Sequence, residues 1–262
     1  MFTNAENYNH GTGRLSRQLA VLFADFVGVQ DGDQVLDVGC GTGSLALSIA
    51  ANQRVDKLVG IDPSTGFIEH ARSQSTDARL EFQVGDAQKL LFPEASFDKS
   101  MALLVIGFFS DAARAVHEMR RVTKPGGIVA ACWWDVGRDN EFHQRIWDAI
   151  TSLEPTMKRP TGGAMTYGSP DALSSLWNAV GLTNVEVSGL EFPYESESFE
   201  HFWHYQYLQG QGGPAAYVVA LPEDRREALK QRFRRGVLGN RSEGAFTVKA
   251  KVWAVRGTVP YR

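Results

Sequence analysis

The stretch QVLDVGCGTG, residues 34–43, decides the fold of this 262-residue chain. It begins as a short β-rich apolar run, ends in glycines at alternate positions, and leads at about Ser44 into a helical pattern. Glycines in such a strand-to-helix turn let a ligand approach the backbone closely. The stretch therefore predicts a nucleotide-like ligand at the end of the first strand, with a tight turn that binds nothing as the alternative.

Strand-like and helical patterns alternate on both sides of this stretch. Further β-rich runs are expected at residues 57–62, 80–86, 97–106 and 126–134. A helix at 111–122 precedes the last of these runs and should stop at the proline and glycines of 124–127. Such alternation is typical of βαβ units and predicts a parallel sheet.

The chain on either side of these units also has readable patterns. Apolar spacing predicts a helix at 15–27, packed by one face on the sheet. After Trp134 we expect the following order: a helix at 141–153, a Gly- and Pro-rich loop, a helix from Ser169 to Gly181, a strand at 184–194, two aromatic-rich or basic helices at 198–235, and a closing strand at 245–257. The two helices thus interrupt the last pair of strands.

Composition narrows the class of protein. The net charge of −3 gives no overall positive field for nucleic acid or anionic membranes. Cys40 and Cys132 lie far apart and follow no metal-ligand spacing, so we expect two core thiols and no disulfide. The first residues lack the pattern of a signal peptide, and no apolar run approaches the roughly 18 residues that cross a bilayer. These features predict a cytoplasmic protein without membrane insertion.

The pattern D-x-G-x-G-x-G from Asp37 to Gly43 resembles that of class I methyltransferases, which use S-adenosylmethionine. Other family motifs follow in the same order along the chain: GIDPS at 60–64, GDA at 85–87, SFD at 96–98 and RRVTKPGG at 120–127. Together they cover about 33–134. Tyr8 and residues 13–16 look like the N-terminal segment of small-molecule methyltransferases of the ubiquinone/menaquinone-biosynthesis type, the methyltransferase type 11 family.

The resemblance implies a Rossmann-like α/β fold. Its sheet has seven mostly parallel strands with the last one antiparallel, helices cover both faces, and a helical cap at about 196–240 is inserted between the last two strands. We expect one domain over 1–262, made of an N-terminal flanking helix (1–30), a cofactor-binding core (31–135) and an acceptor-side half (136–262).

The resemblance also implies a cofactor site at the strand ends. Asp62 would accept hydrogen bonds from both ribose hydroxyls, and Asp86 from the adenine amino group while the Ala87 N–H meets the ring. Backbone carbonyls near Gly39 and Leu103 would hold the ammonium, with Tyr8 and Arg14 for the carboxylate. The expected cofactor-binding set is Tyr8, Arg14, Asp37, Gly39, Cys40, Gly41, Asp62, Pro63, Asp86, Ala87 and Leu103. Within it, Cys40 serves as a small residue that fills the loop.

The implied activity is transfer of a methyl group from S-adenosylmethionine to a small-molecule acceptor. In-line displacement at a sulfonium carbon depends on proximity and exclusion of water, so no metal is expected. The catalytic residue is open: His143, His201 and His204 are the candidates for a general base, although a lone histidine is more often structural. The identity of the acceptor, the methylated atom and the oligomeric state are also open.

Alternatives exist for the activity and for several surfaces. A nicotinamide-dependent oxidoreductase needs a pyrophosphate-binding turn that Ser44 disfavours, and a protein that binds S-adenosylmethionine without catalysis is harder to exclude. Nucleic acid is a disfavoured partner. One of Trp133 and Trp134 is a candidate to line the acceptor pocket, and one should point to the core. The aromatic cluster at 199–207 predicts either an apolar lid over the acceptor or plain packing. The basic stretch at 225–235 predicts either a solvated helix face or a site for an acidic acceptor.

Overall fold

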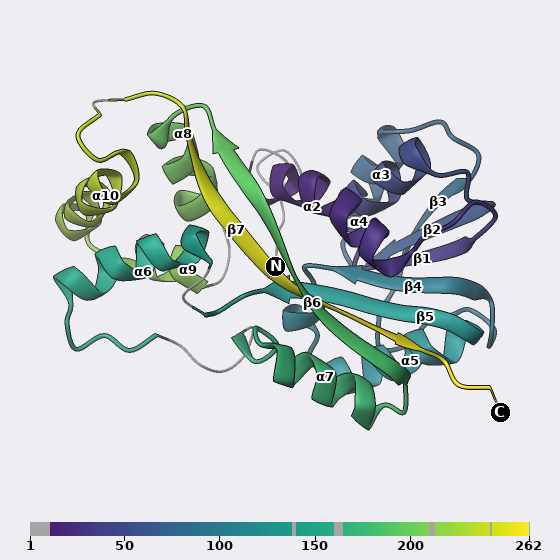
Figure 1. Cartoon of the computed structure of the whole chain (residues 1–262). Coiled ribbons are helices and arrows are strands. Elements are labelled where there is room, and N and C mark those ends of the chain that lie inside the picture. The colour runs from purple at the N-terminus through teal and green to yellow at the C-terminus, as the bar shows by residue number, and fades with distance from the viewer. Residues whose placement is uncertain (1–10, 138–139, 160–164, 210–212, 242, 262) are drawn as a thin grey trace.

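Seven strands form one sheet in the computed structural model, which describes residues 11–137, 140–159, 165–209, 213–241 and 243–261 (Figure 1). The strands are β1 (Gln34–Val38), β2 (Lys57–Asp62), β3 (Leu80–Val84), β4 (Phe97–Leu103), β5 (Thr123–Trp134), β6 (Thr183–Ser196) and β7 (Phe246–Thr258). Their order is β3-β2-β1-β4-β5-β7-β6, with β1 to β5 parallel and β7 antiparallel to both of its neighbours. The predicted fold class is therefore confirmed.

Helices cover both faces of this sheet because successive residues of a strand point to opposite sides. On β1, Val35 joins the core under α2 (Thr12–Val27), α3 (Ser44–Asn52) and α4 (Thr65–Ser73). Its neighbour Leu36 joins the opposite core, under α5 (Ala112–Val122) and α7 (Pro170–Ala179). The helix predicted at 15–27 thus forms as α2, and Ser169 caps α7 as predicted, its hydroxyl accepting a hydrogen bond from the Ala172 N–H at 3.3 Å.

A helical cap stands beyond the carboxyl end of β5 (Figure 1). β5 pairs with β7 only along Val252–Thr258, whereas Phe246–Lys251 of β7 pairs with β6 alone. This outer part of β6 and β7 is a two-stranded ribbon that carries the cap. The cap consists of α6 (Glu141–Leu153), α8 (Phe199–Trp203), the π-helical turn η3 (His204–Leu208), α9 (Gly213–Ala220) and α10 (Glu223–Leu238).

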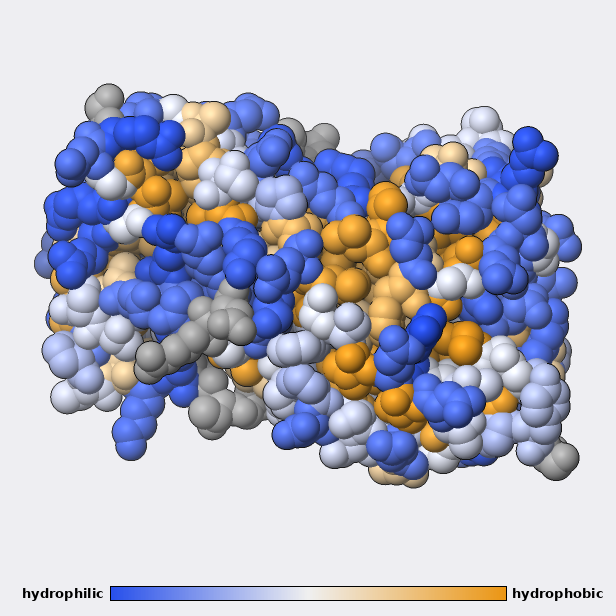
Figure 2. All heavy atoms as spheres, in the orientation of Figure 1, coloured by the Kyte–Doolittle hydropathy of each residue, from blue (hydrophilic) through white to orange (hydrophobic). Residues whose placement is uncertain are grey.

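Aromatic side chains form the interior of the cap. Phe199, Phe202, Trp203 and Tyr207 are buried and pack around Phe233 of α10. For these four residues the structure agrees with the packing interpretation. On the face in Figure 2, residues over α10 are mostly hydrophilic, whereas apolar residues gather near the middle, around the crossing of β6 with the sheet.

The cap contains more helical segments than the two that were predicted, so that prediction was wrong. The described chain between 198 and 235 forms α8 with its π continuation, then α9, then the start of α10. Pro222 separates α9 from α10, because proline disfavours a helical residue before it and has no N–H with which to continue a helix. The pattern of apolar residues alone did not show this break.

Several strand limits also differ from the prediction. β3 ends at Val84 rather than at residue 86, and β6 runs over Thr183–Ser196 rather than 184–194. β5 begins at Thr123, directly after α5, so residues 123–125 lie within the strand rather than before it. Gly126 has φ +80° there, and the pairing with β4 shifts register between Phe97 and Lys99. β4 ends at Leu103 rather than at residue 106, because Leu104 takes a left-handed conformation with φ +53°.

Gly60→Ala tests the close packing that brings β2 against the turn after β1. A Cβ at this position would lie 2.7 Å from Phe82 Cδ1 and 3.0 Å from Cys40 Sγ, so we expect urea unfolding to show a loss of about 1–3 kcal/mol. Gly66→Ala in α4 is the matched control, since nothing lies within 4 Å of its Cβ and alanine favours helix. Equal stabilities of the two variants would contradict this packing.

Candidate functional site

The carboxyl ends of β1, β2, β3 and β4 meet at one edge of the sheet. The Ile61 carbonyl of β2 accepts hydrogen bonds from the N–H groups of Gly39 and Cys40, at 2.8 and 2.9 Å. The Asp62 carbonyl in turn accepts from the Gly85 N–H at 3.1 Å, which ties the loop after β3 to β2. The structure therefore brings together the strand-end residues that the sequence singled out.

The turn after β1 requires glycine. Gly39, Gly41 and Gly43 have φ values of +72°, +55° and +87°, which side chains rarely adopt. A Cβ on Gly39 would also lie 2.5 Å from Cγ2 of Val105, just beyond β4. The turn is thus packed from one side and presents bare backbone to a ligand.

Asp62 joins the turn after β1 to the turn after β2. Its Oδ2 accepts a hydrogen bond from the Gly41 N–H at 3.1 Å and its Oδ1 from the Ser64 N–H at 2.9 Å. Burial raises the pKa of this carboxyl, and the two N–H groups oppose that rise. Since each carboxylate oxygen can accept a second hydrogen bond, Asp62 is held in place and still able to bind a pair of hydroxyls.

Asp37 is a buried carboxyl near the same turn. Among the described residues no donor meets its side-chain oxygens with hydrogen-bond geometry, although the Ala46 N–H is near enough to act on their charge. Burial raises its pKa to about 7, the Ala46 backbone N–H partly opposes that rise, and the charge of Asp62 adds to it. A buried carboxyl of this kind ionises readily only when a cation lies beside it.

The remaining predicted cofactor-binding residues differ in their surroundings. Asp86 is exposed, and its Oδ1 accepts from the Gln88 N–H at 2.9 Å, whereas Ala87 beside it is buried. Leu103 is the buried last residue of β4. Pro63 follows Asp62 in the turn after β2. Burial raises the pKa of the Cys40 thiol well above its ordinary range, which agrees with a residue that only fills the loop.

The N-terminal pair is only partly placed. Tyr8 lies outside the described residues. Arg14, in the first turns of α2, forms an ion pair with Glu197 just after β6, at 3.3 Å. Arg14 therefore lies where α2 meets the cap.

The three histidines lie in the cap and do not meet the strand ends as one group. His201 and His204 both pack their rings on Tyr205. His143 of α6 has its ring 5.2 Å from that of Trp134, and its Nδ1 lies 3.2 Å from Asn140 Nδ2. Burial, with a smaller effect of the Arg159 charge, lowers the His143 pKa to about 4, so this imidazole is neutral at pH 7.

The two tryptophans that end β5 point to different surroundings, and one of them lies in the core as expected. Trp133 is buried in the core under α5 and α7, with its ring 5.2 Å from that of Phe108. Trp134 is half-buried and contacts His143 at the base of the cap. The carboxyl end of β5 therefore meets the cap at Trp134.

Sequence reasoning missed a buried ion pair at the base of the cap. Asp135 and Lys251 lie 3.7 Å apart, and the Lys251 ammonium lies 4.5 Å from the centroid of the Trp253 ring. Asn140 links the same two residues, since its Nδ2 donates to the Asp135 carbonyl and its Oδ1 accepts from the Lys251 N–H. This network pins the start of α6 to β7. β7 carries three basic residues, Lys249, Lys251 and Arg256, and the sequence alone did not show that Lys251 is the buried one.

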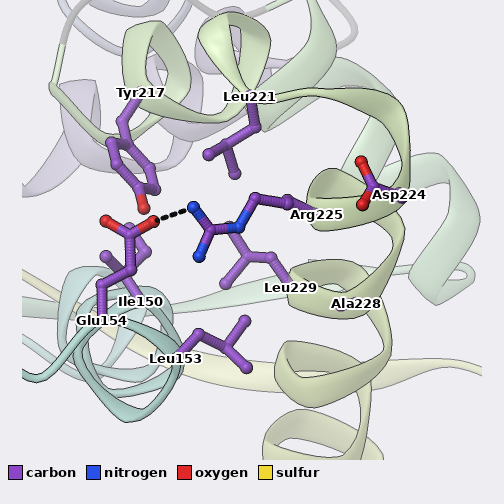
Figure 3. Close-up of a pocket in the computed structure, with 9 residues that line it drawn as sticks. All are labelled: Ile150, Leu153, Glu154, Tyr217, Leu221, Asp224, Arg225, Ala228 and Leu229. Carbon is purple, nitrogen blue, oxygen red and sulfur yellow. Dashed lines mark ion pairs between the residues drawn. The ribbon is translucent and has the colours of Figure 1, made fainter.

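The basic stretch on α10 forms ion pairs with its neighbours. Arg225 pairs with Glu154, Lys230 with Glu200 and Arg234 with Glu243. A hollow of about 160 Å³ lies beside this helix, between α6, α9 and α10, with the Arg225–Glu154 pair across it at 3.2 Å (Figure 3). Its lining residues all belong to the cap and its connections, so this hollow is separate from the strand ends.

In the residues that the structure places, no group of three or more His, Cys, Asp or Glu side chains is arranged to hold a metal ion. None of the helices in that part of the chain combines the length and the apolar composition needed to cross a membrane.

Comparisons with known proteins agree with this geometry. Residues 36–131 match the family model described as a methyltransferase domain. The chain is 30% identical over 223 residues to malonyl-[acyl-carrier protein] O-methyltransferase of Erwinia pyrifoliae, covering 76% of this chain and 82% of that protein. It is 36% identical over 117 residues to demethylmenaquinone methyltransferase of Beutenbergia cavernae, covering 45% of this chain and 46% of that protein. The structure of the YcgJ protein from Bacillus subtilis superimposes with a TM-score of 0.61 at 18% identity, covering 94% and 99% of the two chains.

Asp37→Asn tests the burial of this carboxyl through the pH dependence of stability. The folded pKa of about 7 lies above the unfolded value near 3.8, so the folded protein loses stability as pH rises from about 4 through 7. At pH 8 we expect the free energy of unfolding of the variant to exceed that of the unchanged protein by about 2 kcal/mol. This difference should shrink toward zero as the pH falls to about 4.5. Urea unfolding across this range checks the expectation, and a gap that does not vary with pH would contradict it.

Proposed function

This chain belongs to the class I S-adenosylmethionine-dependent methyltransferases, and we propose that its methyl acceptor is a small molecule held between the strand ends and the cap. The observation that supports this location is the contact of Trp134, at the carboxyl end of β5, with His143 of the cap. The printed names of two relatives, an O-methyltransferase for malonyl-[acyl-carrier protein] and a demethylmenaquinone methyltransferase, support acceptors of metabolic rather than nucleic-acid type.

The strand-end residues fit S-adenosylmethionine. Asp62 keeps acceptor capacity on both carboxylate oxygens after its two backbone hydrogen bonds, which suits two ribose hydroxyls. Asp37 is a buried carboxyl without a described partner, which suits a nearby ammonium. Gly39 leaves no room for a side chain, so the backbone itself meets the ligand.

Each of these groups has a separate task in our proposal. Asp62 orients the ribose, while Asp86 and the Ala87 N–H meet the adenine. The ionised Asp37, with the carbonyls near Gly39 and Leu103, holds the ammonium.

Arg14 and Tyr8 bind the carboxylate of the cofactor in this proposal. Arg14 pairs with the exposed Glu197. Because such a surface ion pair is weak, the carboxylate of the ligand can replace Glu197 beside Arg14 at little cost.

Methyl transfer places few demands on the chain beyond positioning. When bound, S-adenosylmethionine supplies a methyl group on a positively charged sulfur, which an acceptor atom attacks in line. The residues at the strand ends fix one reactant, and the cap encloses the other and excludes water, which is the main source of rate in such a reaction. Trp134 serves as a wall of the acceptor site.

His143 is the candidate for a general base that the structure favours among the three histidines. It is neutral at pH 7 because burial lowers its pKa to about 4, so its ring is ready to accept a proton. It also lies beside Trp134, whereas His201 and His204 pack on Tyr205. Its low pKa makes it a weak base, which suits acceptors whose nucleophile needs little activation.

Asp62→Ala should weaken the binding of S-adenosylhomocysteine. Loss of charge-assisted hydrogen bonds to the ribose costs about 1–3 kcal/mol, equivalent to a rise in Kd of about 5- to 150-fold by titration calorimetry. Asp25→Ala, which removes an exposed carboxylate from α2, is the matched control and should leave Kd unchanged.

A melting curve of the Asp62→Ala variant separates this loss from unfolding, because Asp62 also orders Gly41 and Ser64. A folded variant that binds S-adenosylhomocysteine as tightly as the unchanged protein would overturn the role of Asp62.

A further inference from the structure

A cluster of polar side chains lies inside the aromatic cap, where the cap meets α2. Tyr194 belongs to the outer ribbon of β6, opposite Val248 of β7, and Gln206 and Tyr207 belong to the π turn η3. The Tyr194 hydroxyl accepts a hydrogen bond from Gln206 Nε2 at 3.2 Å. Arg14 of α2 lies close enough for its charge to act on the Tyr194 phenol. The cluster is thus on the side of the cap that faces α2.

Tyr207 has an unusual hydroxyl. The residue is 3% exposed, and its oxygen is buried without a hydrogen-bond partner in the described part of the chain. Its ring packs on Phe202, Trp203 and Phe233, with centroids 5.3–5.7 Å apart. The ring therefore has a full set of packing contacts, and the hydroxyl adds nothing to them.

An unsatisfied buried hydroxyl costs about 1–3 kcal/mol of stability. Phenylalanine would make the same ring contacts without that cost, and the chain has phenylalanine at the neighbouring positions 202, 233 and 246. A buried hydroxyl without a hydrogen-bond partner is expected where a ligand supplies that partner on binding. The π turn is an independent indication, since such turns are frequent at functional sites.

The chemistry of the cluster limits what that ligand group is. Burial raises the pKa of the Tyr207 phenol well above its ordinary range and also raises that of Tyr194, against the smaller effects of Gln206 and Arg14. Tyr207 therefore keeps its proton and acts as a hydrogen-bond donor. A donor recognises an oxygen with lone pairs, and the aromatic surroundings of Tyr207 favour an aromatic group next to that oxygen.

An exposed ion pair holds the cap to α2 beside this cluster. Arg14 and Glu197 bridge α2 and the end of β6 at 3.3 Å, and the Glu197 side chain is 75% exposed. An exposed ion pair of this kind is worth less than about 1 kcal/mol, so it opens at little cost.

We propose that the Tyr207 hydroxyl donates a hydrogen bond to a carboxylate or carbonyl oxygen of the methyl acceptor and thereby selects aromatic acceptors that carry such a group. This inference rests on the proposed function, because it assumes that the acceptor binds between the cap and the strand ends. Tyr207 is then a specificity-determining residue rather than a general base.

Binding of three matched probes to the protein saturated with S-adenosylhomocysteine tests this inference. The probes are trans-cinnamate, trans-cinnamamide and trans-β-methylstyrene, which carry a carboxylate, a neutral carbonyl and no oxygen on the same aromatic body. Calorimetry should give a Kd for at least one oxygen probe that rises about tenfold in Tyr207→Phe. The hydrocarbon should bind both proteins alike. The probe with the larger rise tells whether the group recognised is a carboxylate or a carbonyl.

Two controls separate recognition from a structural role. Tyr205→Phe removes a hydroxyl from the same π turn at a half-exposed position and should leave the Kd of the oxygen probes unchanged. The melting temperature of Tyr207→Phe should equal or exceed that of the unchanged protein, because the variant removes an unsatisfied buried group.

Several results would overturn the inference. They are an equal Kd for the oxygen probes in both proteins, no binding of either oxygen probe at about 10 mM, a lower melting temperature for Tyr207→Phe, and weaker binding of S-adenosylhomocysteine by that variant. The last result would assign the hydroxyl to the cofactor. Failure of the unchanged protein to bind S-adenosylhomocysteine would instead count against the proposed function.

Discussion

One carboxylate, that of Asp62, joins the two turns on which the rest of the site depends. It accepts hydrogen bonds from the Gly41 N–H in the turn after β1 and from the Ser64 N–H in the turn after β2. Because Gly39 and Cys40 also donate to the Ile61 carbonyl, the turn after β1 is fixed by backbone and side chain of one neighbouring strand. A cofactor placed here meets groups that are already oriented, so little conformational entropy is lost on binding.

The cap uses a different construction. β6 and β7 continue past the sheet as a ribbon, and the helices inserted between them pack aromatic side chains around Phe233, in one core with the residues under α2. The buried Asp135–Lys251 pair and Asn140 fix the start of α6 to β7, so this side of the cap is firmly attached. On the α2 side, the Arg14–Glu197 pair is exposed and weak. In the proposed function, an acceptor enters near α2, where the cap is held more weakly.

Sequence reasoning succeeded where the signal is local. The glycines after β1 and the aspartate after β2 act within a few residues of their strands, and all of them meet at the sheet edge as predicted. It failed where the outcome depends on distant partners. The burial of Tyr207 comes from packing on α8 and α10, and the pinning of α6 comes from a lysine more than 100 residues away. The break at Pro222 was readable but was overlooked because the apolar pattern continues across it.

A crystal structure of the protein with S-adenosylhomocysteine tests the central claim most directly. We predict that the ribose hydroxyls lie within hydrogen-bonding distance of the Asp62 carboxylate, with the amino-acid end of the ligand toward Asp37 and the turn after β1. A ligand bound elsewhere, for example in the hollow between α6, α9 and α10, or bound at the strand ends without a contact to Asp62, would contradict the account.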